Sequence, residues 1–132
     1  RIIFRGDSGF CRQLLINWCE RSGVHYVIGL ARNPKLEAIV ALAQLALQDD
    51  YERSGVKQRL IDEFAYAAQT WRHERRVITR LECGPQGQNP RFVVTNLTAD
   101  AATLYEQLYS RVRHALPDFA RFSTTDDCLT TT

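Results

Sequence analysis

The sequence predicts an α/β domain in which a parallel strand–helix–strand unit comes first and an antiparallel meander follows. Two short apolar runs, at 2–4 and 25–31, flank an amphipathic segment at 9–21, and this order of elements forms a parallel pair of strands. Further along the chain, alternation of apolar and polar residues predicts consecutive antiparallel strands at 64–71, 76–81 and 91–97.

The first helix is expected over residues 9–21, where apolar side chains recur at helical intervals and Ser22-Gly23 supplies a stop. The face that we expect to pack inward comprises Phe10, Leu14, Leu15 and Trp18. The strand at 25–31 is nearly continuous in apolar residues, which is typical of a strand covered on both faces.

A second helix is predicted to begin at Asn33-Pro34, because proline suits the first turn of a helix. Its apolar stripe comprises Leu36, Ile39, Val40, Ala43 and Leu47. The composition turns polar between residues 48 and 57, which predicts a loop or a helix break. A shorter helix is expected over Val56 to Asp62.

The last strand and the last helix are marked by turn formers and by a cap. Residues 84–90 are dense in glycine and proline and predict the connection before the strand at 91–97. Thr98-Ala99-Asp100 predicts a helix cap, followed by an apolar stripe of Ala101, Leu104, Tyr105, Leu108 and Tyr109. Beyond Arg113 no period persists, so 114–132 is expected to be an irregular tail, disordered or encoded out of frame.

Composition places the chain among ordinary globular proteins. It has 132 residues, of which 45% are hydrophobic and 24% charged, and its net charge of +2 makes no strong case for nucleic acid by itself. No apolar run is long enough to span a membrane. Because the chain contains no methionine and opens on a strand, we interpret it as a fragment without its upstream part.

The four cysteines are scattered, and their spacing argues against a zinc site. They are Cys11, Cys19, Cys83 and Cys128. In the absence of secretory signals, we expect free thiols in a reducing cytoplasm.

Asp7 is the leading candidate for a functional residue. It follows an apolar strand, and in open α/β sheets ligands and catalytic groups collect at the carboxyl ends of the strands. A carboxylate in that place is a good ligand for a hard metal ion. An aspartate before a helix is also a common N-cap, and spacing alone leaves both interpretations open.

The run Arg5-Gly6-Asp7-Ser8-Gly9-Phe10 resembles the second-aspartate motif of DDE-type insertion-sequence transposases. Four further blocks occur in the order expected of that family: 18–21, 26–33, 91–97, and 104–109 with its Leu-Tyr pairs. The resemblance implies a partial ribonuclease H-like fold over residues 1–113, with an antiparallel β-strand insertion at about 64–97.

The resemblance also implies a chemistry. Such enzymes hold two divalent ions, expected to be Mg²⁺, with three carboxylates, and the ions promote in-line attack on a phosphodiester. Asp7 matches the second carboxylate, and the first would precede Arg1.

The third carboxylate is a glutamate in the pattern Tyr-x-x-Arg-x-x-x-Glu. Tyr109 fits its start, but Val112 and Leu116 occupy the arginine and glutamate positions. Asp118 follows Pro117 and is a poor substitute. We therefore expect a transposase remnant without strand-transfer activity of its own.

DNA contact is the second prediction, with double-stranded transposon ends as the expected partner and a homodimer left open. The candidate residues are Arg5, Arg72, Arg75, Arg76, Arg80 and Arg91. On a strand, Arg76, Ile78 and Arg80 share one face, so two cations would project together at a phosphate backbone. The alternative is that these are solvated charges partly paired with Glu74 and Glu82.

Three interpretations therefore compete. The first is part of a transposase catalytic core, located in the cytoplasm with the nucleoid. The second is a non-catalytic DNA-binding or interaction remnant, and the third is an unrelated α/β domain in which Asp7 is only a cap. Loss of the leading strands would expose a sheet edge and lower solubility.

Overall fold

One mixed sheet forms the centre of the molecule. The structure is a computed structural model that describes residues 2–109. The strands are β1 (Ile3–Gly6), β2 (His25–Leu30), β3 (Gln58–Tyr66), β4 (Arg75–Gly84), β5 (Gly87–Gln88) and β6 (Arg91–Thr95). The helices are α1 (Gln13–Arg21), α2 (Pro34–Ser54) and α3 (Ala101–Thr103), with a 3-10 turn η1 (Ser8–Phe10) and a π-helical turn η2 (Leu104–Tyr109).

The strand order is β1-β2-β6-β4-β3, with the short β5 paired to β4. β1 and β2 are parallel, whereas the β2–β6, β6–β4 and β4–β3 pairs are antiparallel. The predicted α/β fold with a parallel pair and an antiparallel meander is therefore confirmed. Because β6 pairs directly with β2, the meander continues the first sheet and does not form a separate layer.

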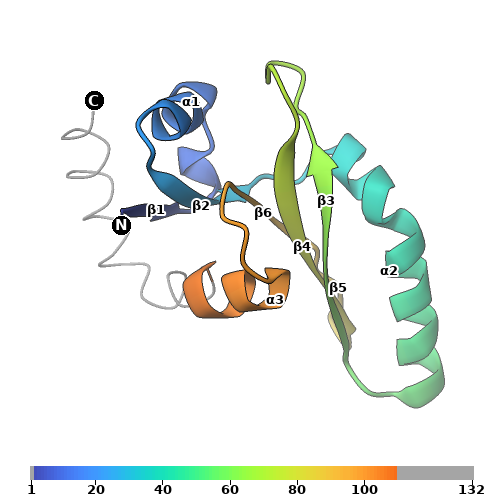
Figure 1. Ribbon diagram of the computed structural model, residues 1–132. Helices are drawn as coiled ribbons and strands as arrows, with labels where there is room; N and C mark the ends of the chain where they lie inside the picture. The colour runs from blue at the N-terminus through green and yellow to red at the C-terminus, as the bar shows by residue number, and fades with distance from the viewer. Residues whose placement is uncertain (1, 110–132) are drawn as a thin grey trace.

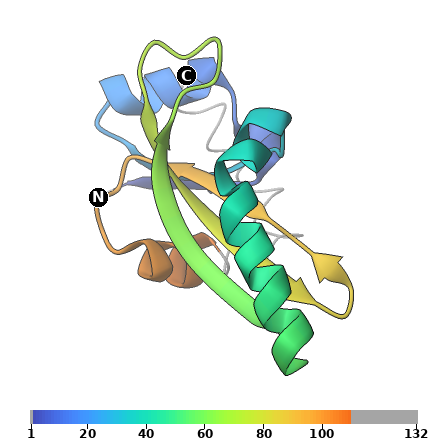
Figure 2. The ribbon, with the colours of Figure 1, turned by 90° about the vertical axis from the view of Figure 1, so that its right-hand side faces the viewer.

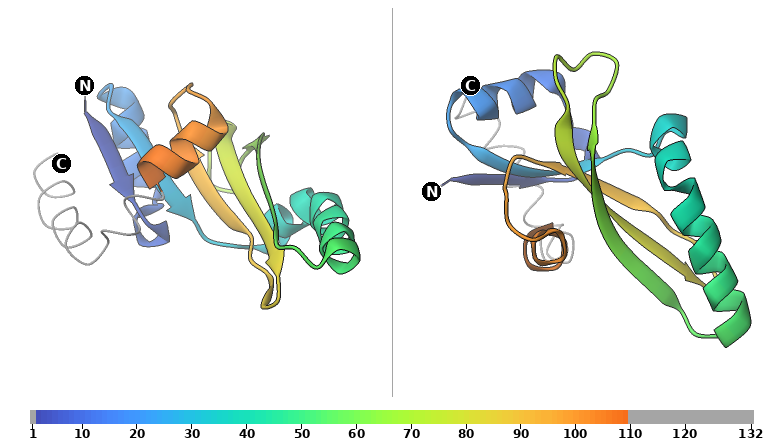
Figure 3. Two further views of the ribbon diagram at one scale, coloured as in Figure 1. Left: turned by 90° about the horizontal axis from the view of Figure 1, so that it is seen from below. Right: turned by 45° about the vertical axis from the view of Figure 1, so that its right-hand side comes forward.

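Helices cover both faces of this sheet (Figures 1 and 3). α1 and α2 pack on one face, where Ile16, Leu36 and Val40 join the larger hydrophobic core. α3 and η2 pack on the other face, where Leu104 and Tyr105 join a smaller core with Val27 and Ile78. Asp100 caps α3 as predicted, with its side chain accepting from the Thr103 N–H at 3.2 Å.

The predicted loop or helix break between residues 48 and 57 is confirmed only at the end of that range, because α2 continues to Ser54. Asn33 caps its start with a side-chain bond to the Leu36 N–H, and Gly55 ends it in the left-handed region at φ +70°. Its last turns are polar because they are exposed, and Arg53 pairs there with Asp49 at 3.2 Å.

The predicted short helix at Val56–Asp62 is wrong. Residues 58–62 of this segment belong to β3, an edge strand that pairs with β4. Its outward residues need not be apolar, so the alternation that marks a strand is weak there. The strand predicted at 64–71 accordingly ends at Tyr66.

The first helix begins later than predicted. Of its predicted inner face, Phe10, Leu15 and Trp18 pack against the larger core, whereas Leu14 does not. Residues 8–10 form a 3-10 turn, and α1 begins only at Gln13. Ile16 and Cys19 are fully buried as a result, whereas Leu14, predicted to face inward, is 84% exposed.

Predictions for the tail at 114–132, and those for Val112, Leu116 and Asp118, fall outside the described residues. Among residues 2–109, no helix has the length and apolar character needed to cross a membrane.

Candidate functional site

Asp7 lies immediately after β1, at the carboxyl end of the parallel pair. Its side chain caps η1, with Oδ1 accepting from the Gly9 N–H at 3.0 Å. Within residues 2–109, its second oxygen, Oδ2, has no hydrogen-bond partner. The cap and a ligand role are therefore compatible, because one carboxylate oxygen serves the turn and the other faces no partner.

The spacing of the aspartate motif has a steric reason. The ring of Phe10 folds back over Gly6, and a Cβ on Gly6 would lie 2.8 Å from a ring carbon. Phe10 also packs edge-on against Phe4, with ring centroids 5.7 Å apart. The glycine and the aromatic residue thus fix the turn that carries Asp7 onto the strand before it.

A cavity of about 370 Å³ opens at the same end of the sheet. It is lined by Ser8, Leu30, Ala31, Arg32, Asn89, Pro90, Arg91 and Phe92. Arg91 was predicted from the sequence, whereas Arg32 was not. The signal for Arg32 was present, since it follows a strand just as Asp7 does. Arg32 also bonds Glu37 at 2.8 Å, and both side chains remain about half exposed.

The strand registers separate the predicted arginines along the sheet. Thr79 pairs with Phe92, which pairs with Leu30 at the carboxyl end of β2, and Arg80 pairs with Arg91 just beyond. Arg75, at the start of β4, lies at the opposite end of the strands, and Arg72 lies in the turn before it. By register, Asp7 is level with Ile78 of β4, so Arg75 lies three residues, or roughly 10 Å, toward the start of that strand, whereas Arg91 lies two residues toward the other end.

Arg76 and Arg80 share a face with Ile78, as predicted, but α3 and η2 cover that face. Arg76 pairs with Glu63 and donates to the Leu97 carbonyl at 2.8 Å. Arg80 donates to the Asn89 carbonyl at 3.0 Å and lies over the Tyr105 ring. Their side chains are only 23% and 15% exposed, so both act mainly within the fold.

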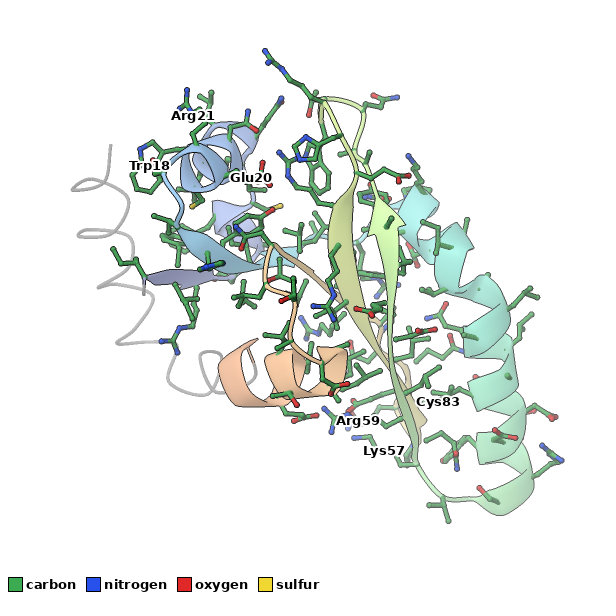
Figure 4. The ribbon with its side chains drawn as sticks, in the orientation of Figure 1. Trp18, Glu20, Arg21, Lys57, Arg59 and Cys83 are labelled. Atoms are coloured by element: carbon green, nitrogen blue, oxygen red, sulfur yellow. The ribbon has the colours of Figure 1, made fainter. Side chains whose placement is uncertain are left out.

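A ladder of opposite charges continues along this face. Glu82 lies 3.4 Å from Arg80, 3.6 Å from Lys57 and 3.7 Å from Arg59. Arg59 in turn pairs with Glu106 on η2, and Figure 4 shows Arg59 and Lys57 near the end of the sheet away from α1. Glu82 was anticipated as a partner of the arginines, and the ladder ties the last helix to the sheet.

Arg75 is part of a buried network on the opposite face. Its side chain is 3% exposed and forms two bonds with Glu20, at 2.8 and 2.9 Å. The Trp71 ring lies 5.0 Å from its guanidinium carbon, and Glu20 projects from the side of α1 turned toward β4 (Figure 4). This placement gives Arg75 a structural role, joining β4 to α1.

The network shifts the ionisation of its members. Hydrogen bonding from Arg75 lowers the pKa of Glu20, an effect that burial opposes. Burial, together with a hydrogen bond to Glu20 at 2.8 Å, raises the pKa of Tyr26 far above its usual range. Glu20 is therefore a fixed anion and Tyr26 a neutral donor at neutral pH.

Arg5 occupies a partly buried position of β1, opposite Val27 in the register. It lies two residues before Asp7, on the face of the sheet that carries Arg76. Within residues 2–109, no three His, Cys, Asp or Glu side chains come together in a way that could hold a metal ion. Asp7 is the residue of this part of the chain that the aspartate motif marks as a candidate ligand.

The fold and the aspartate turn together define a class of protein. A mixed α/β sheet with an acidic residue at a strand's carboxyl end, where functional groups of α/β sheets collect, is consistent with a ribonuclease H-like transposase domain. A family model described as transposase DDE domain group 1 matches residues 1–115, and the chain belongs to this family. No curated protein and no solved structure matches the chain. Membership supports a role in DNA transposition, and the family generally uses divalent metal ions.

Proposed function

We propose that this chain contributes to phosphodiester cleavage and strand transfer at transposon ends, with Asp7 as one of the active-site carboxylates. The observation that carries the proposal is the position of Asp7 at the carboxyl end of β1, beside a cavity lined by Arg32 and Arg91. That arrangement puts a metal-ligating oxygen and phosphate-binding cations at one edge of the sheet.

The chemistry of Asp7 fits Mg²⁺, which accepts one or two carboxylates and keeps several waters. Metal ions held by a DDE centre activate a water or a 3′-hydroxyl for attack on phosphorus. The residues described here supply one such carboxylate, and the described part of the chain has no group of three ligands. We therefore expect the 132-residue chain alone to lack cleavage activity.

The proposed DNA surface is the Asp7 edge of the sheet. Arg91 and Arg32 line the cavity there, and Arg5 lies on the adjoining strand. Arg72 is exposed at the opposite end and would contact a different stretch of duplex. We leave Arg75, Arg76 and Arg80 out of this surface because their guanidinium groups are engaged within the fold.

Duplex binding, measured by fluorescence anisotropy over a series of salt concentrations, tests this surface. Arg91→Ala should weaken binding to every sequence and reduce the salt slope by about 1, as expected for one lost phosphate contact. Arg53→Ala is the matched control, since Arg53 is exposed on α2 and pairs with Asp49 and Asp50. Equal effects of both substitutions would refute the proposed surface.

Asp7→Asn separates the cap from the charge, because asparagine is as good an N-cap as aspartate. In EDTA this variant should bind duplex more tightly than the wild type, since a negative charge near the phosphates is removed. Mg²⁺ should raise the affinity of the wild type and leave the variant unchanged. Asp62→Asn, on the distant edge strand β3, is the control. Identical metal responses in wild type and Asp7→Asn would exclude a ligand role.

A second candidate function is a DNA-binding or interaction module without catalysis. The lack of a group of three metal ligands among the described residues favours it. Incubating the chain with Mg²⁺ or Mn²⁺ and a labelled transposon-end duplex separates the two. We expect no specific nicking, and nicking that Asp7→Ala abolishes would show that the chain is catalytically competent alone.

A further inference from the structure

α2 presents large apolar side chains on the face that it turns away from the sheet. Its inner face buries Leu36, Val40 and Leu47, whereas Leu42 and Leu45 are 81% and 65% exposed. α2 is the outermost element on its side of the sheet, and in Figure 2 it lies in front of the strands. Exposed leucines at adjoining helical positions differ from the isolated surface leucines that occur on most proteins.

The spacing of this outer face suits pairing with another helix. Ala38, Leu42, Leu45 and Asp49 are separated by four, three and four residues, which is the a/d spacing of two-helix seams. Ala41 and Ala46 are also exposed near the centre of the helix, and small residues there permit close approach of a second helix. With 21 residues, α2 is about 31 Å long and offers three turns of such a seam.

The charges along α2 select the orientation of the partner. Around its N-terminus, residues 32–37 carry Arg32, Lys35 and Glu37, a net positive charge. Around its C-terminus, residues 49–53 carry three acidic residues and only Arg53 to balance them. A parallel partner would place like charges together, whereas an antiparallel copy would place opposite charges together.

We propose that the outer face of α2 is a self-association surface, on which α2 of a second copy of this chain packs in the antiparallel direction. A two-fold axis between residues 43 and 44 places Leu42 opposite the second copy's Leu45 and Lys35 opposite its Glu52. Lys35 is held in place by the Ala67 carbonyl at 2.8 Å and lies over the Tyr66 ring, so its charge is fixed near this end of the seam. The inference goes beyond the proposed function and is independent of DNA binding.

Sedimentation velocity over a range of roughly 1 to 500 µM tests the proposal, since a single helix pair is smaller than most stable interfaces and should be weak. We expect a concentration-dependent dimer. Leu42→Glu/Leu45→Glu should raise its dissociation constant by about tenfold or more, because both central contacts are lost. Leu14→Glu is the matched control, since Leu14 is equally exposed but lies on α1, and it should leave dimerisation unchanged.

Charge reversal provides a test that does not depend on the leucines. Lys35→Glu and Glu52→Lys should each weaken the dimer, whereas a mixture of the two variants should form a heterodimer in which every facing pair is again of opposite sign. Circular dichroism establishes that each variant is folded. A monomer at all concentrations, a dimer insensitive to Leu42→Glu/Leu45→Glu, or failure of the mixed variants to pair would overturn the proposal.

Discussion

At the scale of single residues, the chain uses its charges mainly to hold itself together. The network of polar contacts around Arg75 illustrates this, because the guanidinium lies within the fold and donates two hydrogen bonds to Glu20. Removing one partner of such a pair leaves an uncompensated buried charge, which costs more than the pair contributes. An arginine near a predicted DNA surface can therefore be essential for stability without contacting DNA.

Glu20→Ala should destabilise the fold by about 3 kcal/mol at pH 7, because Arg75 then loses its partner. The pKa of Glu20 is lowered in the folded state, so its contribution is fully present above the unfolded value of 4.5 and is lost as pH falls through the folded value. Urea unfolding of wild type and Glu20→Ala at pH 7 and at lower pH should show a difference that shrinks in acid. Asp62→Asn, at an exposed site on β3, is the control, and a difference independent of pH would contradict this account.

Gly6→Ala tests the packing of the aspartate turn. The new Cβ would meet the Phe10 ring at 2.8 Å, so either the ring or the strand must move, at a cost of about 1 to 3 kcal/mol. Thermal unfolding of Gly6→Ala and of Gly6→Ala/Phe10→Leu measures this, because the smaller side chain should restore part of the loss. A Gly6→Ala variant as stable as the wild type would show that the turn has more room than the structure indicates.

At the scale of elements, α2 continues for several residues beyond its predicted apolar stripe, which ends at Leu47. Its last turns follow Leu47, the last buried residue of the helix. Tyr51 there still packs against the core, and side-chain pairs such as Arg53 with Asp49 stabilise these turns. The end is set by Gly55, whose φ of +70° is strained for other residues. The helix therefore stops at a conformational signal and not at the change in hydrophobicity.

Gly55→Ala should cost about 1 kcal/mol, because alanine resists the left-handed conformation. Gly55→Asn should cost less, since asparagine tolerates that region better than other non-glycine residues. Chemical denaturation of the two variants compares them directly. If alanine and asparagine were equally tolerated, the left-handed end of α2 would be in doubt.

At the scale of the whole molecule, the described sheet has two edge strands, β1 and β3, and the edge at β1 lies next to an exposed apolar residue. β1 pairs only with β2, and Ile2 beside it is exposed. An open edge with an apolar residue next to it is a template for irregular association, which agrees with the low solubility expected from the sequence.

Ile2→Lys should increase the soluble yield and reduce light scattering, because a charge next to an edge strand opposes edge-to-edge pairing. Leu14→Lys adds the same charge on α1, away from the edge, and should have a smaller effect. Unfolding temperatures of both variants verify that stability is unchanged. A larger gain from Leu14→Lys would place the aggregation surface elsewhere.

Much of the fold could be predicted because it is encoded locally. The parallel unit follows from two apolar runs around a helix, and the cap at Asp100 and the helix start at Asn33-Pro34 follow from side-chain chemistry. β3 could not be predicted in the same way. As an edge strand it lacks a strong alternation, and only its pairing with β4 makes it a strand.

The same distinction between local signals and tertiary pairing applies to the candidate site. The sequence by itself determined the position of Asp7 at the end of a strand, because a strand, a glycine and a cap are all local signals. Only the tertiary structure decided which arginines lie near Asp7, because that depends on strand register and on which face α3 covers. Arg91 and Arg32 line the cavity at the Asp7 end of the sheet, whereas Arg75 is buried toward the opposite end. Pairing between strands that are distant in the sequence sets the position of each arginine along the sheet.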